Sequence, residues 1–187
     1  MSAGPSGFRF RSLAGISVLA LALLLFLAAG FWLKRLSIRP SERLPDLGPF
    51  PSFSARDNAG RFRTASDLAG KIWVGDVLPP NCPSCTVRHL RMMDLQTSLS
   101  RARDVVLVTF VQDPSLMSSE KLVELAREFG AVNGRWIFLA GPVSLRPEEF
   151  VLVDGSGRVR ARIAESSPAI SSELLDAVGD LIRERRR

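Results

Sequence analysis

Two cysteines, Cys82 and Cys85, are the only ones in this chain of 187 residues, and they stand in a single tetrapeptide, Cys-Pro-Ser-Cys. A disulfide between residues so close in sequence constrains the unfolded chain little, so it adds little stability. Structural disulfides in small proteins instead join distant segments, which spreads the cysteines along the chain. The pair is therefore better explained by redox chemistry or by metal binding.

The residues around the pair predict a strand before it and a helix after it. Residues 72–78 are rich in β-branched and aromatic side chains, and two prolines end this strand. From residue 86 to residue 100 apolar side chains recur at helical spacing. The N terminus of a helix carries unpaired N–H groups and a partial positive charge, and both favour a thiolate. We therefore expect Cys82 to be the exposed, nucleophilic thiol and Cys85, one turn further along, to be the resolving thiol.

Strands and helices alternate along the rest of the chain, which predicts an α/β fold with a mixed central sheet. The turn Asn58-Ala59-Gly60 indicates an N-terminal β-hairpin. The remaining elements are expected as strands at 105–111, 136–139, 150–153 and 158–163, and as helices at 120–129 and from about residue 172. Together they predict one folded domain over residues 50–187, preceded by a proline-containing linker over 34–49.

An apolar run without charge covers residues 13–33, and its 21 residues are about the length that crosses a bilayer as a helix. A cleavable signal peptide has a shorter apolar region and a small-x-small cleavage site, which Ala28-Ala29-Gly30 matches poorly. We therefore predict an N-terminal tail over 1–11 and an uncleaved transmembrane signal anchor over 12–33.

Charges on the two sides of the apolar run bear on its orientation. Two arginines precede it, whereas four basic residues follow it: Lys34, Arg35, Arg39 and Arg43. The positive-inside rule alone would therefore place the folded domain in the cytoplasm. The net charge of +6 suits an anionic surface, but the sequence has no zinc-finger spacing and no RNA-recognition signature, so we expect no nucleic-acid partner.

Several segments resemble the Sco/SenC family of membrane-anchored, thioredoxin-fold proteins, which help to assemble the copper centre of cytochrome c oxidase. The resemblance extends from about residue 44 to 163 and rests on the order of five segments: Asp67–Val74, Asp113-Pro114, Leu122–Phe129, Trp136–Gly141 and Val153–Arg160. It implies a thioredoxin-like fold, a membrane location with the domain outside the cytoplasm on the periplasmic side, and a partner that carries a thiol or a disulfide. A copper-centre subunit of cytochrome c oxidase is one such partner.

The candidate site departs from this family in three respects. The family spaces its cysteines C-x-x-x-C, whereas this chain has C-x-x-C. The position of the family's copper-binding histidine aligns with Arg146, and Met117 stands near the place of an acidic residue. Around Pro147 the chain instead resembles membrane-anchored reductases of the TlpA type. In thioredoxin-like proteins the equivalent proline usually has a cis bond and lies against the cysteines, so we expect Pro147 to be a site residue with a cis bond.

Copper binding stays open on the residues alone. Copper(I) accepts soft thiolates, and His89 lies four residues after Cys85 on the same helix face, so Cys82, Cys85 and His89 form a conceivable ligand set. The alternative is that His89 is an ordinary surface or packing histidine.

Three functions are consistent with the sequence. The first is a thiol–disulfide oxidoreductase that acts on extracytoplasmic partners and needs no bound cofactor. The second is a copper(I) metallochaperone of Sco type, and the third is an assembly factor in which the thiols are dispensable. The cysteine pair and Pro147 favour the first, whereas the body of the domain supports the second.

Overall fold

The computed structural model describes residues 21–30, 32, 43–82 and 85–187. The chain divides into two units, Met1–Ser41 and Glu42–Arg187. In the first unit, residues 21–30 and 32 are helical. The described part of the chain contains no helix of the length and hydrophobicity that crossing a membrane requires. The predicted tail over 1–11, and half of the predicted anchor over 12–33, lie outside the described residues.

The second unit is built on one mixed sheet of seven strands in the order β2-β1-β5-β4-β3-β6-β7. The strands are β1 Ser54–Asp57, β2 Phe62–Thr64, β3 Ile72–Leu78, β4 Val105–Val111, β5 Trp136–Ala140, β6 Glu149–Val153 and β7 Val159–Ala164. The three central strands β3, β4 and β5 are parallel, whereas β6 runs antiparallel to β3. Strands β1 and β2 pair as an antiparallel hairpin, so the predicted mixed sheet and N-terminal hairpin are confirmed.

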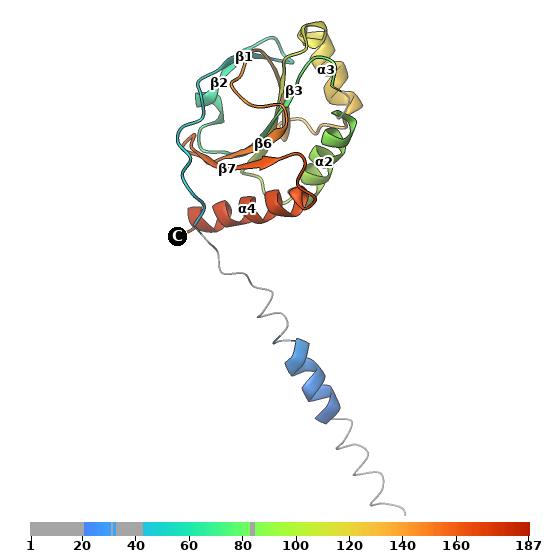
Figure 1. Cartoon of the computed structure of the whole chain (residues 1–187), viewed down its shortest axis with the longest axis vertical. Helices are drawn as coiled ribbons and strands as arrows, with labels where there is room; N and C mark the ends of the chain where they lie inside the picture. Colours follow the sequence, from blue (N-terminus) through green and yellow to red (C-terminus); the bar gives the residue numbers. More distant parts are fainter. Residues whose placement is uncertain (1–20, 31, 33–42, 83–84) are drawn as a thin grey trace, which may run out of the picture. The chain divides into compact units, whose positions relative to one another are not determined.

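Three α-helices cover one face of this sheet (Figure 1). They are α2 Cys85–Ser98, α3 Ser119–Glu128 and α4 Ile170–Arg185, and two short 3₁₀ helices, η1 Ala65–Leu68 and η2 Pro114–Leu116, lie in loops. Helix α2 connects the parallel strands β3 and β4, and α3 connects β4 to β5, so both connections step in the same direction across the sheet. Because such crossovers are right-handed, both helices come to lie on the same face.

Each face of the sheet buries its own apolar core, because side chains alternate along every strand. On the helix side, Met92 and Leu95 of α2 pack with Val74 and Leu78 of β3. On the other side, Trp73 and Val77 of β3 pack with aromatic residues of the segment that precedes β1. Part of the predicted linker belongs to the domain, since the Leu47 N–H donates to the Val159 carbonyl at 2.9 Å.

Strand β3 carries the chain to the candidate site. Its carboxyl end points toward the cysteines, and β6, which is antiparallel to it, begins at the same end of the sheet. The segment between β5 and β6, which contains Pro147, therefore reaches this end of the sheet before β6 begins.

Candidate functional site

Cys82 and Cys85 form a disulfide, with their Cα atoms 5.4 Å apart. Asn81 precedes the pair with a φ of 53°, a left-handed conformation that asparagine tolerates better than most residues do. Helix α2 begins at Cys85, whose N–H donates to the Cys82 carbonyl at 3.4 Å. Cys82 is half-buried and Cys85 is buried.

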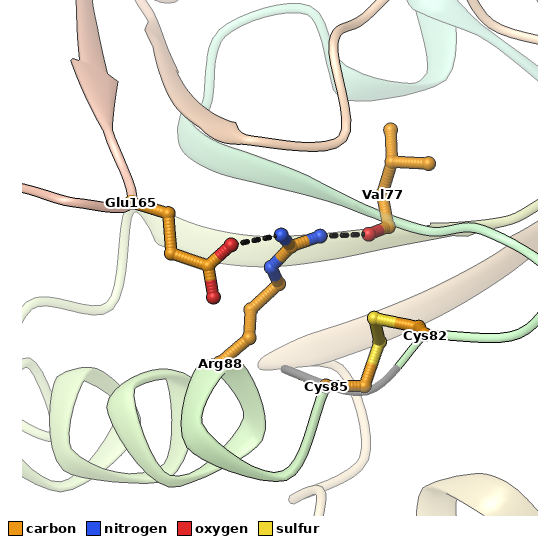
Figure 2. Close-up of a disulfide and its surroundings, with 5 residues drawn as sticks. All are labelled: Val77, Cys82, Cys85, Arg88 and Glu165. Atoms are coloured by element: carbon orange, nitrogen blue, oxygen red, sulfur yellow. Dashed lines mark hydrogen bonds and ion pairs between the residues drawn. A yellow bond between two sulfur atoms is a disulfide. The ribbon is translucent and has the colours of Figure 1, made fainter.

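Arg88 lies one turn further along α2 than Cys85. Figure 2 shows its guanidinium between two acceptors: one nitrogen donates to the carbonyl of Val77 in β3, and another donates to the carboxylate of Glu165. Glu165 directly follows β7, and its carbonyl accepts a hydrogen bond from Arg91 of α2 at 2.6 Å. In the Arg88–Glu165 ion pair 3% of the arginine side chain and 15% of the glutamate side chain are exposed, so the arginine is buried and the glutamate is half-buried.

Asp76 is a second buried charged group, and it lies on β3 with no exposed surface. Its carboxylate accepts a hydrogen bond from the Thr109 hydroxyl at 2.6 Å, and the Thr109 oxygen in turn accepts from the indole N–H of Trp136 at 2.9 Å. Burial raises the pKa of Asp76 from 3.8 to about 6, although the Thr109 hydrogen bond and the positive charge of Arg88 oppose this. The negative charge of Glu165 raises the same pKa further. Asp76 therefore changes its protonation state near neutral pH.

Hydrogen bonding in this cluster is incomplete. One oxygen of Asp76, one oxygen of Glu165 and the Nε of Arg88 are buried and have no hydrogen-bond partner within the described part of the chain. Buried polar atoms in folded proteins are nearly always satisfied, and an unsatisfied group is costly in a low-dielectric interior.

His89 belongs to the core beside this cluster, with 4% of its surface exposed. Its ring stacks on Phe129 with the centroids 3.4 Å apart, and it hydrogen-bonds the backbone of Cys85. Burial lowers the pKa of His89 to about 4, with the nearby charge of Arg88 acting in the same direction, so the ring is neutral at physiological pH. Across the described ranges, no three His, Cys, Asp or Glu residues are grouped so that they could hold a metal ion. The structure thus joins the two cysteines and places the His89 ring against Phe129.

The expected cis bond at Pro147 is wrong. The described residues contain no cis peptide bond, so Arg146 and Pro147 are joined in trans. The Glu149 N–H donates to the Arg146 carbonyl at 3.3 Å, which closes a four-residue turn with Pro147 at its second position. A trans proline fits that position of a common β-turn, whereas a cis proline needs the third. Pro147 remains at the same end of the sheet as the disulfide, and Arg146 is exposed.

Sequence reasoning missed the three charged residues of the cluster. A signal for Asp76 was present, because an aspartate inside an apolar strand must be buried with a partner or carry out a function. No such signal existed for Arg88 and Glu165, which are 77 positions apart and look like ordinary surface residues.

A Cys-x-x-Cys disulfide between a parallel strand and the helix that follows it, on a mixed sheet, defines a thioredoxin-like protein with a redox-capable cysteine pair. No protein-family model matches the sequence. No curated protein matches it either. The fold is nevertheless that of the Sco/SenC structures, as the resemblance in the sequence predicted.

Three solved structures illustrate this likeness. A SCO1/SenC family lipoprotein from Bacillus anthracis is 23% identical with a TM-score of 0.63, and the match covers 73% of this chain and 97% of that one. The second structure is BsSco, a member of the Sco family of cytochrome c oxidase assembly proteins in which a disulfide switch was identified. It is 23% identical with a TM-score of 0.55, and the match covers 72% of this chain and 96% of that one. Copper-bound yeast Sco1 is 18% identical with a TM-score of 0.57, and the match covers 72% of this chain and 90% of that one.

Proposed function

We propose that this chain is a membrane-anchored thiol–disulfide oxidoreductase that exchanges its Cys82–Cys85 disulfide with cysteines of extracytoplasmic proteins. The observation that carries the proposal is the disulfide at the start of α2, in which Cys82 is the less buried of the two residues. Helix α2 presents unpaired N–H groups at that end, and they stabilise the thiolate that exchange requires.

The reaction can be written with both thiols of a partner. A partner thiolate attacks the Cys82 sulfur, the S–S bond breaks, and the electron pair stays on the Cys85 sulfur. The Cys85 thiolate then takes up a proton. The second partner thiolate then attacks the mixed disulfide and releases Cys82 as a thiolate. The partner has lost two electrons and formed its own disulfide, and the domain has gained both electrons; the reverse sequence reduces a partner.

The setting of this activity is part of the proposal. The apolar run over 13–33 supports an anchor in the cell membrane, and the likeness to Sco proteins supports a domain outside the cytoplasm. A disulfide persists in that compartment more readily than in the cytoplasm. The membership of BsSco in a family of cytochrome c oxidase assembly proteins supports a partner of that pathway, such as a copper-centre subunit whose cysteines need reduction.

Copper(I) carriage is the second candidate, and the copper-bound structure of yeast Sco1 is the observation that favours it. After reduction, Cys82 and Cys85 supply two soft thiolates, which suit copper(I). A third ligand would have to come from elsewhere, because the neutral His89 ring is stacked in the core and Arg146 brings a positive charge.

The test is a pair of single substitutions in the full-length chain. Cys85→Ser should accumulate mixed disulfides through Cys82 when it meets partner thiols, because the resolving thiol is absent. The matched control, Cys82→Ser, should accumulate far fewer, since Cys85 is buried. Equal trapping by both variants, or a wild-type pair that does not exchange with a glutathione redox buffer, would refute the assignment.

A copper titration separates the second candidate from the first. The reduced full-length protein is titrated anaerobically with copper(I) against a competing chelator. Tight binding in a one-to-one ratio, lost in the double cysteine variant, would favour the metallochaperone. No competition for copper, together with reversible disulfide exchange, would leave the oxidoreductase.

A further inference from the structure

Exposed arginines gather at one end of the folded domain. They come from three places in the sequence: the start of the domain, the turn before β4 and the last turn of α4. Two neighbouring hollows of the surface are lined by them, one by Arg101, Arg103 and Arg186 and the other by Arg43 and Arg187. All five are exposed, and none of them forms an ion pair within the described ranges. We call the surface that these five arginines form the basic end.

Helix α4 brings the three places together. Arg185 donates to the Gly70 carbonyl at 2.9 Å and lies 3.8 Å from the Asp104 carboxylate, so it joins α4 to the turns before β3 and β4. The Leu44 N–H donates to the carboxylate of Glu184 at 2.9 Å, which joins α4 to the start of the domain. Figure 1 shows the C terminus beside the start of the domain. The basic end is therefore one continuous surface.

The exposed acidic groups at the basic end already have cationic partners. Asp46 pairs with Arg158, and Asp104 lies within ion-pair distance of Lys71 and Arg185. These carboxylates are therefore balanced by other cations, and the five arginines of the basic end remain in excess. An unbalanced positive surface of this kind attracts an anionic one.

The chain enters the domain at the basic end, and the entry is fixed by hydrogen bonds. The Arg160 guanidinium donates to the carbonyls of Leu44 and Pro45 at 2.7 and 3.0 Å, and it also pairs with the carboxylates of Asp154 and Glu184. The apolar run ends ten residues before Arg43 in the sequence, and ten residues span at most about 35 Å. An anchor in that run therefore keeps the basic end within this distance of the bilayer.

The disulfide lies at the opposite end of the sheet. Ile72, the first residue of β3, lines the same hollow as Arg101 and Arg103, whereas the cysteines follow the last residue of β3. A strand of this length advances about 20 Å. The Debye length at physiological ionic strength is about 8 Å, so charges at the basic end are screened from the disulfide. The basic end can therefore contact a charged surface without covering the cysteines.

We propose that the basic end docks on anionic phospholipid headgroups of the membrane that holds the anchor, so that the disulfide end of the domain is directed away from the bilayer and toward partner proteins. A guanidinium donates paired hydrogen bonds to phosphate oxygens, which suits arginine to this role. Each arginine near an anionic surface favours the bound state by about fivefold. The inference rests on the membrane anchor of the proposed function and adds to it a lipid chemistry and an orientation.

The test measures how fast phenylglyoxal modifies individual arginines of the full-length protein in lipid nanodiscs, read by mass spectrometry. Discs of phosphatidylcholine alone are compared with discs of equal parts phosphatidylcholine and phosphatidylglycerol. Arg101, Arg103 and Arg186 should react about fivefold more slowly in the anionic discs. Two exposed arginines elsewhere, Arg127 on α3 and Arg146 near the disulfide end, should react at the same rate in both. High salt should abolish the difference while the protein stays in the discs.

A pair of double variants tests whether charge holds the domain on the lipid. Arg101→Gln with Arg103→Gln removes two arginines of the basic end, so the ratio of bound to free domain should fall by about 30-fold and Arg186 should lose its protection. The matched control, Lys121→Gln with Arg127→Gln, removes the same charge from the exposed surface of α3 and should leave Arg186 protected. Equal loss of protection in both double variants would contradict a specific role for the basic end.

The outcomes separate this inference from the proposed function. Equal modification in the two kinds of disc overturns the inference, and so does protection of Arg146 to the same extent as Arg186, because the disulfide end would then face the bilayer. A chain that does not enter the discs refutes the anchor of the proposed function and the inference with it. A chain that enters them and shows no lipid-dependent protection refutes only the inference.

Discussion

Replacing Asp76 with asparagine should change how the stability of the domain depends on pH. The pKa of Asp76 rises from 3.8 to about 6 because burial disfavours the charged carboxylate. Between these two pH values the unfolded chain releases the proton while the folded chain retains it. The stabilising contribution is therefore fully present below pH 3.8 and is lost as the pH rises through 6. At 1.36 kcal/mol for each pH unit, the difference amounts to about 3 kcal/mol.

His89 has the opposite effect over nearly the same range. Burial lowers its pKa from 6.5 to about 4, so between these values the unfolded chain binds a proton that the folded chain does not. Its contribution to stability is present above pH 6.5 and is lost as the pH falls through 4, again by about 3 kcal/mol. The two effects nearly cancel in the wild-type protein. Asp76→Asn keeps an oxygen for the Thr109 hydrogen bond but removes the pH-dependent contribution of Asp76. The pH dependence that His89 gives to the stability should then become visible.

The assay is urea unfolding of the oxidised full-length chain at several pH values between 4.5 and 7, followed by the fluorescence of the buried Trp73 and Trp136. The wild-type free energy of unfolding should change little over this range. The free energy of unfolding of Asp76→Asn should rise with pH, by about 1.36 kcal/mol per pH unit. By pH 7 it should exceed the wild-type value by most of the difference of about 3 kcal/mol. The control, His89→Gln, should lose stability as the pH rises. If the wild type and Asp76→Asn show parallel pH profiles, the burial argument for Asp76 is refuted.

Two further predictions concern the packing of the sheet and of the first hairpin. A Cβ on Gly75 would lie 2.7 Å from Cζ3 of Trp73 and 3.0 Å from Cγ1 of Val151. Gly75→Ala should therefore destabilise the domain by about 1–3 kcal/mol in urea unfolding. An unchanged urea midpoint of unfolding would contradict this packing. Asp57 accepts hydrogen bonds at 2.9 Å from the N–H groups of Ala59 and Arg61. Burial raises its pKa, but these bonds and those from the side chains of Arg63 and Arg61 together outweigh burial and lower the pKa of Asp57. Asp57→Ala should cost about 1–3 kcal/mol and should speed amide hydrogen exchange in the β1–β2 hairpin more than in β4, whereas equal exchange in both would count against a local role.

Much of the fold could be predicted from local patterns. Strands β3 and β4 are short and rich in β-branched and aromatic residues, whereas α3 carries its buried residues at helical spacing, so length, composition and periodicity together separate these elements. The hairpin turn was predictable because Gly60 takes a left-handed φ of 75°, which glycine adopts without strain. Position 147 was not predictable in the same way, because both isomers of a prolyl bond are compatible with a turn and the hydrogen bond that closes this one is a tertiary detail.

The candidate site could be predicted only in part, and the reason lies in how charges are buried. The cost of burying a charge depends on its partners, so a sequence can reveal that Asp76 needs a partner without revealing which one. In this fold the balancing charges come from α2 and from the end of β7, which only the closed sheet brings together.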